Sequence, residues 1–286
     1  MTRAFTALAR PAIESRARRN LTARHRAKQA EILQASAHHR VTTCVSMRSR
    51  LGPPATLDVA AYLEVRNMKM SKLDMLTPEN SALALIDYQP AMYQGVQSHD
   101  RLVVLNNVQV VAKAAKLFNI PTVISTVAAD SFSGPFMPEV LETFPKHKVI
   151  DRTSMNAWLD PAFRKAVAAT GRKKFVIAGL WTEACVQFPT LDMLKEGYEI
   201  YIPADACGDV SLEAHNRAMD RSVQAGAIPV TSLQYVFELQ QDWARTATYE
   251  GVMNILRAHS PYGIQVRFSK WALGEHASEA GAKAGG

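Results

Sequence analysis

The chain has 286 residues, of which 48% are hydrophobic and 21% are charged, with 14 glycines and 14 prolines. This composition excludes a fibrous, collagen-like or wholly disordered protein and supplies enough apolar side chains for a sizeable core. No run reaches the ~18 apolar residues that a membrane span requires, and three scattered cysteines are too few for a disulfide scaffold. We therefore expect a protein outside the membrane, with free thiols in a reducing compartment.

The formal net charge of +7 is concentrated at the N-terminus. Residues 1–50 carry eleven Lys and Arg against two Glu, a net +9, so the rest of the chain sums to −2. We expect residues 1–74 to be a basic, disordered extension without chemistry. A mitochondrial transit peptide and an arm that binds polyanions are the alternatives. The folded domain is expected to bind no nucleic acid, and the predicted location is cytoplasmic, or mitochondrial if residues 1–50 are a transit peptide.

From residue 81 onwards, short apolar runs alternate with helical patterns. The predicted strands are 82–86, 122–127, 149–150, 175–178, 198–202 and 228–230, and a final amphipathic helical stretch covers about 233–259. Helix ends are marked by Asn119, Gly171, Gly197 and Gly226, and Asp160 before Pro161 marks a helix start.

This alternation of strands and helices is typical of an α/β protein whose parallel sheet is covered on both faces. We predict a single Rossmann-like, three-layer α/β/α domain with a mainly parallel sheet over residues 75–273. Residues 274–286 are rich in Ala and Gly and are expected to form a flexible tail.

Three reactive side chains stand at predicted strand ends, where open parallel sheets bind their ligands. Asp87 follows the first strand, Arg152 the third, and Cys185 follows the 175–178 strand at the start of the next helix. A helix N-terminus and a guanidinium both favour thiolate over thiol, so we expect Cys185 to be held ionised. Taken singly, Asp87 could be a turn former and Cys185 a core side chain. Arg152 could pair with the neighbouring Asp151.

The motifs of several other chemistries are missing from the sequence. There is no G-x-G-x-x-G after the first strand, no G-x-x-x-x-G-K-[ST] loop, no G-x-S-x-G and no H-E-x-x-H. We therefore expect neither a metal ion nor a cofactor.

Five strings of the predicted domain match a known pattern. They are Leu85-Ile-Asp87-Tyr-Gln89, Arg152-Thr-Ser-Met-Asn-Ala-Trp158, Ala178-Gly-Leu-Trp-Thr-Glu-Ala-Cys185-Val, Gly197-Tyr-Glu and Asp205-Ala. Together they resemble the isochorismatase-like cysteine hydrolases. Further strings, such as Gln97-Ser-His-Asp100 and Phe132-Ser-Gly-Pro135, resemble the YcaC-type subgroup of oligomeric hydrolases. The resemblance covers about residues 76–270.

The resemblance implies a catalytic triad of Asp87, Cys185 and a basic residue. Arg152 stands where the wider superfamily has Lys, and its permanent charge can hold the other two in place but cannot shuttle protons. A cis peptide bond between Leu180 and Trp181 is also implied, with the backbone N–H groups of Trp181 and Cys185 as the oxyanion hole. True isochorismatases lack the cysteine, and metal-dependent nicotinamidases carry a histidine that is missing here, so we expect neither activity.

We therefore predict a metal-independent cysteine hydrolase that cleaves a small amide-type C–N bond through a thioester on Cys185. The predicted pocket residues are Gln89, Phe132, Trp158 and Trp181, although the aromatic ones are equally typical of a core or a subunit interface. The alternative is a catalytically silent, oligomeric scaffold that keeps the fold. The C-terminal helical segment is longer than one core needs, and the resemblance implies that it builds a homo-oligomer of several subunits. The expected ligand is a small-molecule substrate.

Overall fold

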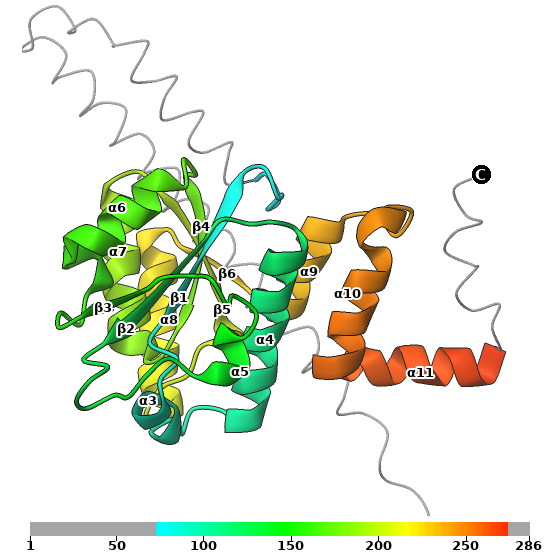
Figure 1. Ribbon diagram of the computed structural model, residues 1–286, viewed down its shortest axis with the longest axis horizontal. Helices are drawn as coiled ribbons and strands as arrows, with labels where there is room; N and C mark the ends of the chain where they lie inside the picture. Colours follow the sequence, from blue (N-terminus) through cyan, green and yellow to red (C-terminus); the bar gives the residue numbers. More distant parts are fainter. Residues whose placement is uncertain (1–72, 274–286) are drawn as a thin grey trace, which may run out of the picture. The chain divides into compact units, whose positions relative to one another are not determined.

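The described part of the chain, residues 73–273 of a computed structural model, is built around one six-stranded sheet (Figure 1). The strands are β1 (Ser81–Ile86), β2 (Thr122–Val127), β3 (Val149–Arg152), β4 (Lys174–Gly179), β5 (Glu199–Pro203) and β6 (Ile228–Val230). All neighbours pair in parallel, in the order β3-β2-β1-β4-β5-β6. The predicted α/β architecture is therefore confirmed. The predicted tail, and the extension apart from its last two residues, lie outside the described residues.

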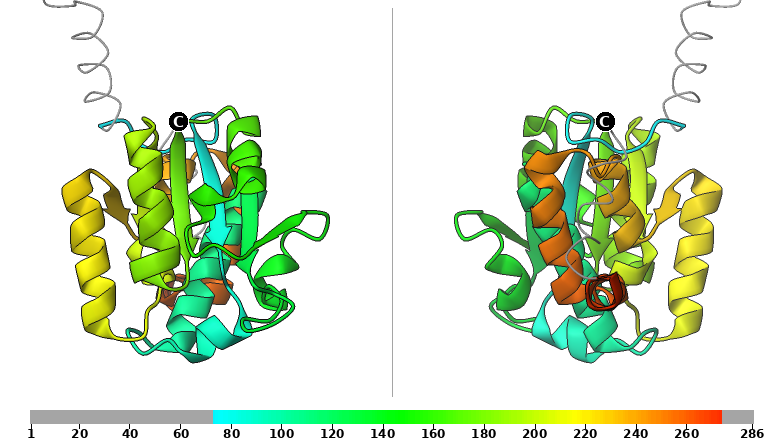
Figure 2. Two further views of the ribbon diagram at one scale, coloured as in Figure 1. Left: turned by 90° about the vertical axis from the view of Figure 1, so that its left-hand side faces the viewer. Right: turned by 90° about the vertical axis from the view of Figure 1, so that its right-hand side faces the viewer.

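The helices cover both faces of this sheet. They are α3 (Pro90–Gln94), α4 (Arg101–Leu117), α5 (Pro138–Leu141), α6 (Pro161–Ala169), α7 (Gln187–Lys195), α8 (Leu212–Ala225), α9 (Ser232–Gln240), α10 (Thr246–His259) and α11 (Pro261–Leu273). Helices α6, α7 and α8 lie on one face, whereas α4, α9 and α10 lie on the other (Figure 1 and Figure 2). The chain builds outward from β1 in one direction and then from β4 in the other, and right-handed crossovers place the two sets of helices on opposite faces.

The apolar strands of the sequence form the centre of the core. Every residue of β1 and of β4 is buried, as expected for parallel strands covered on both sides. Local signals also placed the helix ends correctly. The Asp160 carboxylate accepts hydrogen bonds from two backbone N–H groups at the start of α6, and Asn119, just beyond α4, has a φ of 55°.

The C-terminal helical stretch differs from its prediction. Instead of one stretch over 233–259, two helices, α9 and α10, cover this range and α11 follows them, and the chain turns at Gln241 with a φ of 56°. The side chain of Gln240 stabilises this turn by donating to the backbone carbonyls of Asp242 and Arg245. The apolar spacing continues on both sides of the turn, so periodicity alone did not reveal it.

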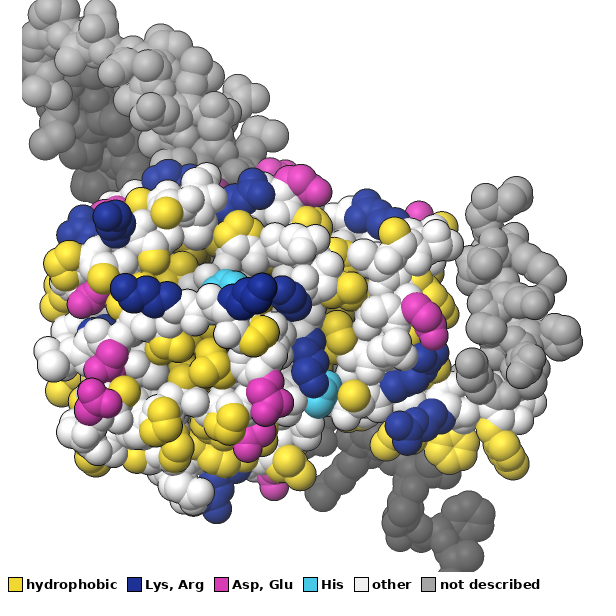
Figure 3. All heavy atoms as spheres, viewed as in Figure 1, with side chains coloured by type: hydrophobic (Ala, Val, Ile, Leu, Met, Phe, Trp, Pro, Cys, Tyr) yellow, Lys and Arg dark blue, Asp and Glu magenta, His cyan; other side chains and the backbone are white. Residues whose placement is uncertain are grey.

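Helix α11 packs against α10 and leaves large apolar side chains in solvent. Ile264, Phe268 and Trp271 are 58%, 63% and 83% exposed. In the space-filling view, hydrophobic side chains gather at the end of the molecule where α11 lies (Figure 3). Within residues 73–273, no helix is both long enough and apolar enough to cross a membrane.

Candidate active site

The carboxyl ends of the strands bring the three predicted side chains together. Asp87 follows β1, Arg152 ends β3, and Cys185 lies in the turn after β4. Strands β1 and β4 are neighbours, so Asp87 and Cys185 meet at the point where the order of the sheet reverses, the usual ligand position of such folds. Strand β2 separates β3 from β1, and the Arg152 side chain therefore reaches across its end. On the way, Nη1 of Arg152 donates to the carbonyl oxygen of Thr126 on β2 at 3.0 Å.

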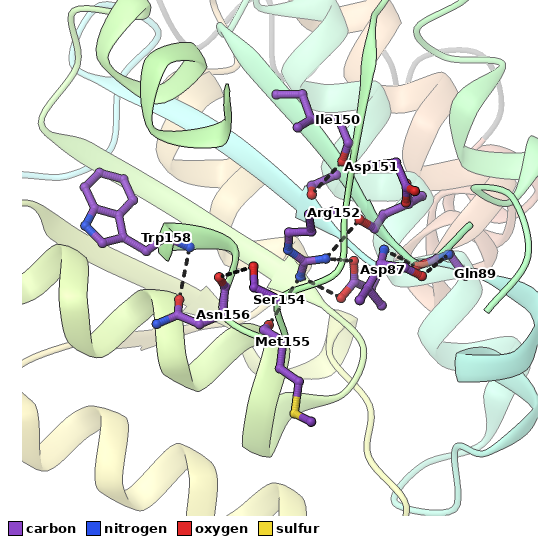
Figure 4. A network of polar contacts seen from close by, with 12 residues as sticks. Asp87, Gln89, Ile150, Asp151, Arg152, Ser154, Met155, Asn156 and Trp158 are labelled. Carbon is purple, nitrogen blue, oxygen red and sulfur yellow. Dashed lines mark hydrogen bonds and ion pairs between the residues drawn. The ribbon is translucent and has the colours of Figure 1, made fainter. Parts of the chain in front are cut away.

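Arg152 and Asp87 form a buried, two-pronged ion pair (Figure 4). Nη1 donates to Oδ1 at 2.9 Å and Nη2 donates to Oδ2 at 2.8 Å, and the two side chains are 1% and 0% exposed. A charge pair at this depth is stable only when its geometry and its hydrogen bonds are nearly complete. Asp151 takes other partners, the Thr126 hydroxyl and the Ala129 backbone N–H, so it does not neutralise Arg152.

Cys185 lies in a single π-helical turn, Thr182–Val186, which we call the cysteine turn and which leads directly into α7. The thiol lies close enough to the Asp87 carboxylate for each group to shift the pKa of the other, and the residue is 4% exposed. Gly179 allows this approach, since a Cβ there would lie 2.6 Å from the carbonyl oxygen of Ile86. The ends of β4 and β1 can therefore approach closely only with glycine at this position.

The protonation state of the site differs from its prediction. Burial raises the pKa of the Cys185 thiol far above its ordinary value, and the Asp87 carboxylate raises it further. The opposing effects of Arg152 and of the hydrogen bond from the Trp181 backbone are smaller. Burial also raises the pKa of Asp87, against the lowering effect of Arg152. The expectation that Cys185 is held ionised is therefore wrong, because the Arg152 charge is already paired with Asp87 and the sulfur is almost fully desolvated.

Of the two predicted oxyanion donors, Trp181 immediately precedes the cysteine turn and Cys185 is the fourth residue of the turn. The peptide bond between Leu180 and Trp181 is cis, and the Trp181 backbone is close enough to the Cys185 sulfur to lower the pKa of the thiol. The Trp181 indole N–H donates to the Met92 carbonyl oxygen at 2.9 Å, which ties the ring to α3. A Cβ on Gly95 would lie 2.8 Å from the Trp181 ring, so this glycine makes room for the indole. Nothing in the sequence pattern had pointed to Gly95.

Two of the other predicted pocket residues lie around the loop after β2. Gln89 is fully buried, and its side-chain amide makes three hydrogen bonds, to the N–H and the carbonyl of Val127 and to the carbonyl of Gly134. These bonds hold the loop against the end of β1, so Gln89 has a structural role next to the site. Phe132, on the same loop, is 70% exposed. In this chain its ring is on the surface and does not wall an enclosed pocket.

Trp158 does not join the triad. Its indole N–H donates to Glu196 Oε1 at 2.7 Å, and its ring packs edge-on against Tyr198 with ring centroids 5.4 Å apart. Figure 4 shows the ring on the far side of Asn156, pointing away from Asp87. Trp158 therefore has the core role that was the alternative for the predicted aromatic residues.

A second polar group, which no sequence pattern had indicated, holds the start of the cysteine turn. The Thr182 hydroxyl contacts both the Gly208 carbonyl oxygen, at 3.1 Å, and Nδ1 of His215, at 2.9 Å. The Glu183 backbone N–H donates to the Asp209 carboxylate at 2.7 Å. Thr182 lies within a string that carried the resemblance, but His215 is 33 residues further along the chain and no local pattern links the two.

The residues that could hold a metal ion can be surveyed over 73–273. In that part of the chain, no three His, Cys, Asp or Glu side chains lie together in a way that could coordinate one. At the triad, the Asp87 carboxylate is already engaged by Arg152 and by the Cys185 thiol. Function without a metal ion or a cofactor stays a prediction.

Known proteins resemble this chain over much of its α/β domain. Residues 81–234 match the family described as the Isochorismatase domain. The chain is 35% identical over 187 residues to the probable hydrolase YcaC of Escherichia coli (strain K12), covering 65% of this chain and 89% of the relative. It is 26% identical over 192 residues to a secreted isochorismatase effector of Phytophthora sojae (strain P6497), covering 66% and 90%.

Solved structures show the same likeness over nearly the whole length of the relatives. The YcaC gene product of Escherichia coli, an octameric hydrolase of unknown specificity, superposes with a TM-score of 0.66 at 34% identity, covering 70% of this chain and 97% of that one. YcaC from Pseudomonas aeruginosa, with hexane-2,5-diol and covalent acrylamide, superposes with a TM-score of 0.65 at 35% identity, covering 68% and 96%.

Proposed function

The chain belongs to the isochorismatase-like hydrolase family, and on this premise we propose that it is a metal-independent cysteine hydrolase that cleaves a small amide-type C–N bond. One observation carries the proposal. The Cys185 thiol interacts with a carboxylate that Arg152 holds by two hydrogen bonds. A nucleophile, its base and a group that orients the base are thus in contact, which is the arrangement that nucleophilic catalysis requires.

Acylation starts from the protonated thiol. As the Cys185 sulfur attacks the amide carbonyl carbon, the thiol proton passes to Asp87 and the carbonyl π electrons move onto the oxygen. The backbone N–H groups of Trp181 and Cys185 donate to this oxyanion. When the tetrahedral adduct collapses, the C–N bond breaks, the leaving amine takes the proton from Asp87, and an acyl thioester remains on Cys185.

Deacylation uses water in place of the thiol. Asp87, again a carboxylate, takes a proton from water as the water oxygen attacks the thioester carbonyl carbon. Collapse releases a carboxylic acid, and the thiolate recovers its proton from Asp87. The raised pKa of Asp87 suits both steps, because it makes this carboxylate a stronger base than an ordinary aspartate.

Arg152 has a different role, because a guanidinium stays charged and cannot transfer a proton at neutral pH. Its two hydrogen bonds fix the plane of the Asp87 carboxylate, and its charge limits the rise in the Asp87 pKa. Both effects keep Asp87 in the ionised, correctly oriented form that accepts the thiol proton.

The covalent acrylamide in the relative from Pseudomonas aeruginosa supports a reactive thiol, since acrylamide is a thiol-directed electrophile. For the present chain, acrylamide followed by intact-mass spectrometry tests the nucleophile directly. Cys44, outside the described residues, is replaced by Ala in every protein, so that the mass reports only Cys185 and Cys207. We expect one acrylamide adduct in this background and in Cys207→Ala, and none in Cys185→Ala, because Cys207 is fully buried.

Turnover is tested with a panel of small primary and secondary amides, by following amine release and trapping the acyl-enzyme in acid. Cys185→Ala should form no acyl adduct and release no amine, whereas Cys207→Ala should match the parent. Amine release from Cys185→Ala at the parent rate would refute the mechanism. A Cys185 that is inert to acrylamide, in a protein that turns over no amide, would favour the silent scaffold.

We further propose that the chain assembles with copies of itself. The relative from Escherichia coli is octameric, and 97% of its length is covered by the superposition. Helix α11 exposes Ile264, Phe268 and Trp271, an apolar surface of the kind that subunit interfaces bury. Light scattering of the full chain should give the mass of several subunits, and a monomer mass would contradict this proposal.

A further inference from the structure

A cluster of five polar side chains lies at the start of the cysteine turn and, within residues 73–273, shares no hydrogen bond or ion pair with Asp87 or Arg152. It consists of Ser98, His99, Thr182, Asp209 and His215, which we call the histidine cluster. Thr182, Asp209 and His215 are 1%, 0% and 4% exposed, so most of the cluster is deeply buried. Groups this polar are buried only where hydrogen bonds replace those made with water.

The first two residues of the cysteine turn are held by this cluster. Thr182 donates to the Gly208 carbonyl oxygen from its backbone N–H, at 3.1 Å, and its hydroxyl lies 2.9 Å from Nδ1 of His215. The Asp209 carboxylate accepts from the Glu183 backbone N–H at 2.7 Å. The turn therefore has fixed attachments at two successive residues, immediately after Trp181 and immediately before the segment that carries Cys185.

The remaining contacts close the cluster into a ring. The His215 and His99 rings meet edge to face with centroids 4.6 Å apart. Nδ1 of His99 lies 2.8 Å from the Ser98 hydroxyl, which accepts from the Asp209 backbone N–H at 2.9 Å. Helix α8, which carries His215, is thus connected to the turn both directly and through the segment before α4. A displacement of His215 would directly alter its contact with the Thr182 hydroxyl.

The charge state of the cluster suits a role in positioning. Burial lowers the pKa of His215 to about 4 and lowers that of His99 as well, so both rings are neutral near pH 7. The cluster therefore adds no positive charge that could stabilise a thiolate. Its effect on Cys185 must come from the geometry of the turn.

We propose that His215 is a positioning residue for the reaction at Cys185. Through the Thr182 hydroxyl it holds the cysteine turn so that the Trp181 backbone N–H points to the oxygen on which negative charge develops. The oxyanion in this statement rests on the proposed function, but the position of the donor is testable without any turnover.

Two alkylating probes separate the position of the donor from the accessibility of the thiol. When the Cys185 sulfur adds to the terminal carbon of acrylamide, the C=C π electrons move and negative charge develops on the amide oxygen. The α-carbon then takes up a proton equivalent to the one that the thiol gave to Asp87. Iodoacetamide reacts by displacement of iodide, and no oxyanion forms. The ratio of the two alkylation rates therefore measures donation to the oxyanion.

The variants come in matched pairs, all in the Cys44→Ala, Cys207→Ala background. His215→Leu and Thr182→Val remove the contact, whereas His215→Asn and Thr182→Ser keep a polar atom near the same position. For His215→Leu and Thr182→Val we expect the rate of alkylation by acrylamide to fall by about tenfold or more, and the rate with iodoacetamide to change by less than about threefold. For His215→Asn and Thr182→Ser both rates should stay within about threefold of the parent. The double variant His215→Leu/Thr182→Val should be no slower than Thr182→Val alone, since that substitution already removes the contact with His215 together with the one to the Gly208 carbonyl oxygen.

Several outcomes would overturn the proposal. These are an unchanged probe ratio in His215→Leu and Thr182→Val, an equal loss in the conservative variants, or an additive double variant. If His215→Leu does not fold by circular dichroism, the Thr182 pair decides, because valine is nearly isosteric with threonine. A parent protein that hydrolyses no amide but shows the expected ratios would refute the proposed function and leave the positioning role intact. Amide hydrolysis by the parent, together with an unchanged ratio of alkylation rates in the variants, would support the proposed function and refute the positioning role.

Discussion

The two sides of the cysteine turn are buried to a similar degree but differ in charge. On one side, Asp87 and Arg152 form an ion pair whose side chains are 0% and 1% exposed. On the other side, His215 and Thr182 meet as neutral groups, 4% and 1% exposed. A buried charge that loses its partner costs several kcal/mol, whereas a neutral hydrogen bond contributes about 1 kcal/mol. Because the two sides differ in charge, we expect very different responses to substitution despite their similar burial.

The difference also separates the chemical roles of the two sides. The pKa values of Cys185 and Asp87 are both raised, and one proton lies between them, so proton transfer belongs to this side. The histidines on the other side are neutral at pH 7, and His215 contacts the turn through the Thr182 hydroxyl. Changes on the triad side should therefore abolish reactivity, and changes on the histidine side should reduce it.

The largest effect is expected for Asp87→Asn. The thiol then loses its base, which should lower acrylamide alkylation of Cys185 by about 10²–10⁴-fold at pH 7. The Arg152 guanidinium also loses its counter-charge, so the free energy of unfolding should fall by about 3 kcal/mol. The matched control is Asp151→Asn, because Asp151 is exposed and does not pair with Arg152. Alkylation of Asp87→Asn at the parent rate would remove Asp87 from the mechanism.

A smaller effect is expected for Arg152→Lys, which keeps the charge and loses the two-pronged geometry. A single ammonium cannot make all four contacts, to both Asp87 oxygens and to the carbonyls of Thr126 and Met155. We expect a loss of about 1–2 kcal/mol in the free energy of unfolding, measured with urea, and a rate loss smaller than that of Asp87→Asn. Arg152→Met should lose more of both. If Arg152→Lys and Arg152→Met behave alike, the charge at this position does not matter.

The sequence was sufficient where the physical cause is local. Strand β2 begins and ends at the predicted residues, and Asp160 caps the helix that it was expected to open. The neighbourhood of Asp87, Arg152 and Cys185 follows from strand order together with a resemblance in short strings. Each of these inferences needs only the nearest neighbours in the chain, or the rule that parallel strands end on the same edge.

The sequence was insufficient where burial and distant partners decide. Whether Cys185 is a thiolate depends on how completely the fold desolvates its sulfur, and no local pattern contains that quantity. Trp158 was predicted to line a pocket, but its position is set by Glu196, 38 residues further along the chain. The contact of His215 with Thr182 was not predicted for the same reason, since the two residues lie on different elements.

The histidine side makes a prediction for acid stability. The folded state keeps His215 neutral down to about pH 4, whereas an unfolded chain protonates it below its ordinary value of 6.5. The unfolded state then binds more protons than the folded state, so this contribution to stability falls as pH drops from about 6.5 towards 4. Between pH 7 and pH 4.5 we expect the free energy of unfolding to lose about 2 kcal/mol from this group.

His215→Asn is the control for this measurement, because asparagine does not titrate. His99, the charged neighbour that His215 faces when both are protonated, is present in both proteins, so the difference between their pH profiles isolates His215. Parallel profiles for the parent and His215→Asn over this range would show that His215 is not held neutral, and the contrast between the two sides of the turn would disappear.

The smallest effect is expected for Trp158→Phe, which tests whether Trp158 belongs to the site. Trp158→Phe removes the hydrogen bond to Glu196 and keeps a ring against Tyr198, so we expect a loss of about 1 kcal/mol in the free energy of unfolding. Because the indole points away from Asp87, the acrylamide rate of Cys185 should stay within about twofold of the parent. A rate change of tenfold or more without further loss of stability would restore Trp158 to the site, as the sequence had predicted. It would also mean that the segment between β3 and α6 transmits its position to the triad, through the Met155 carbonyl that Arg152 contacts.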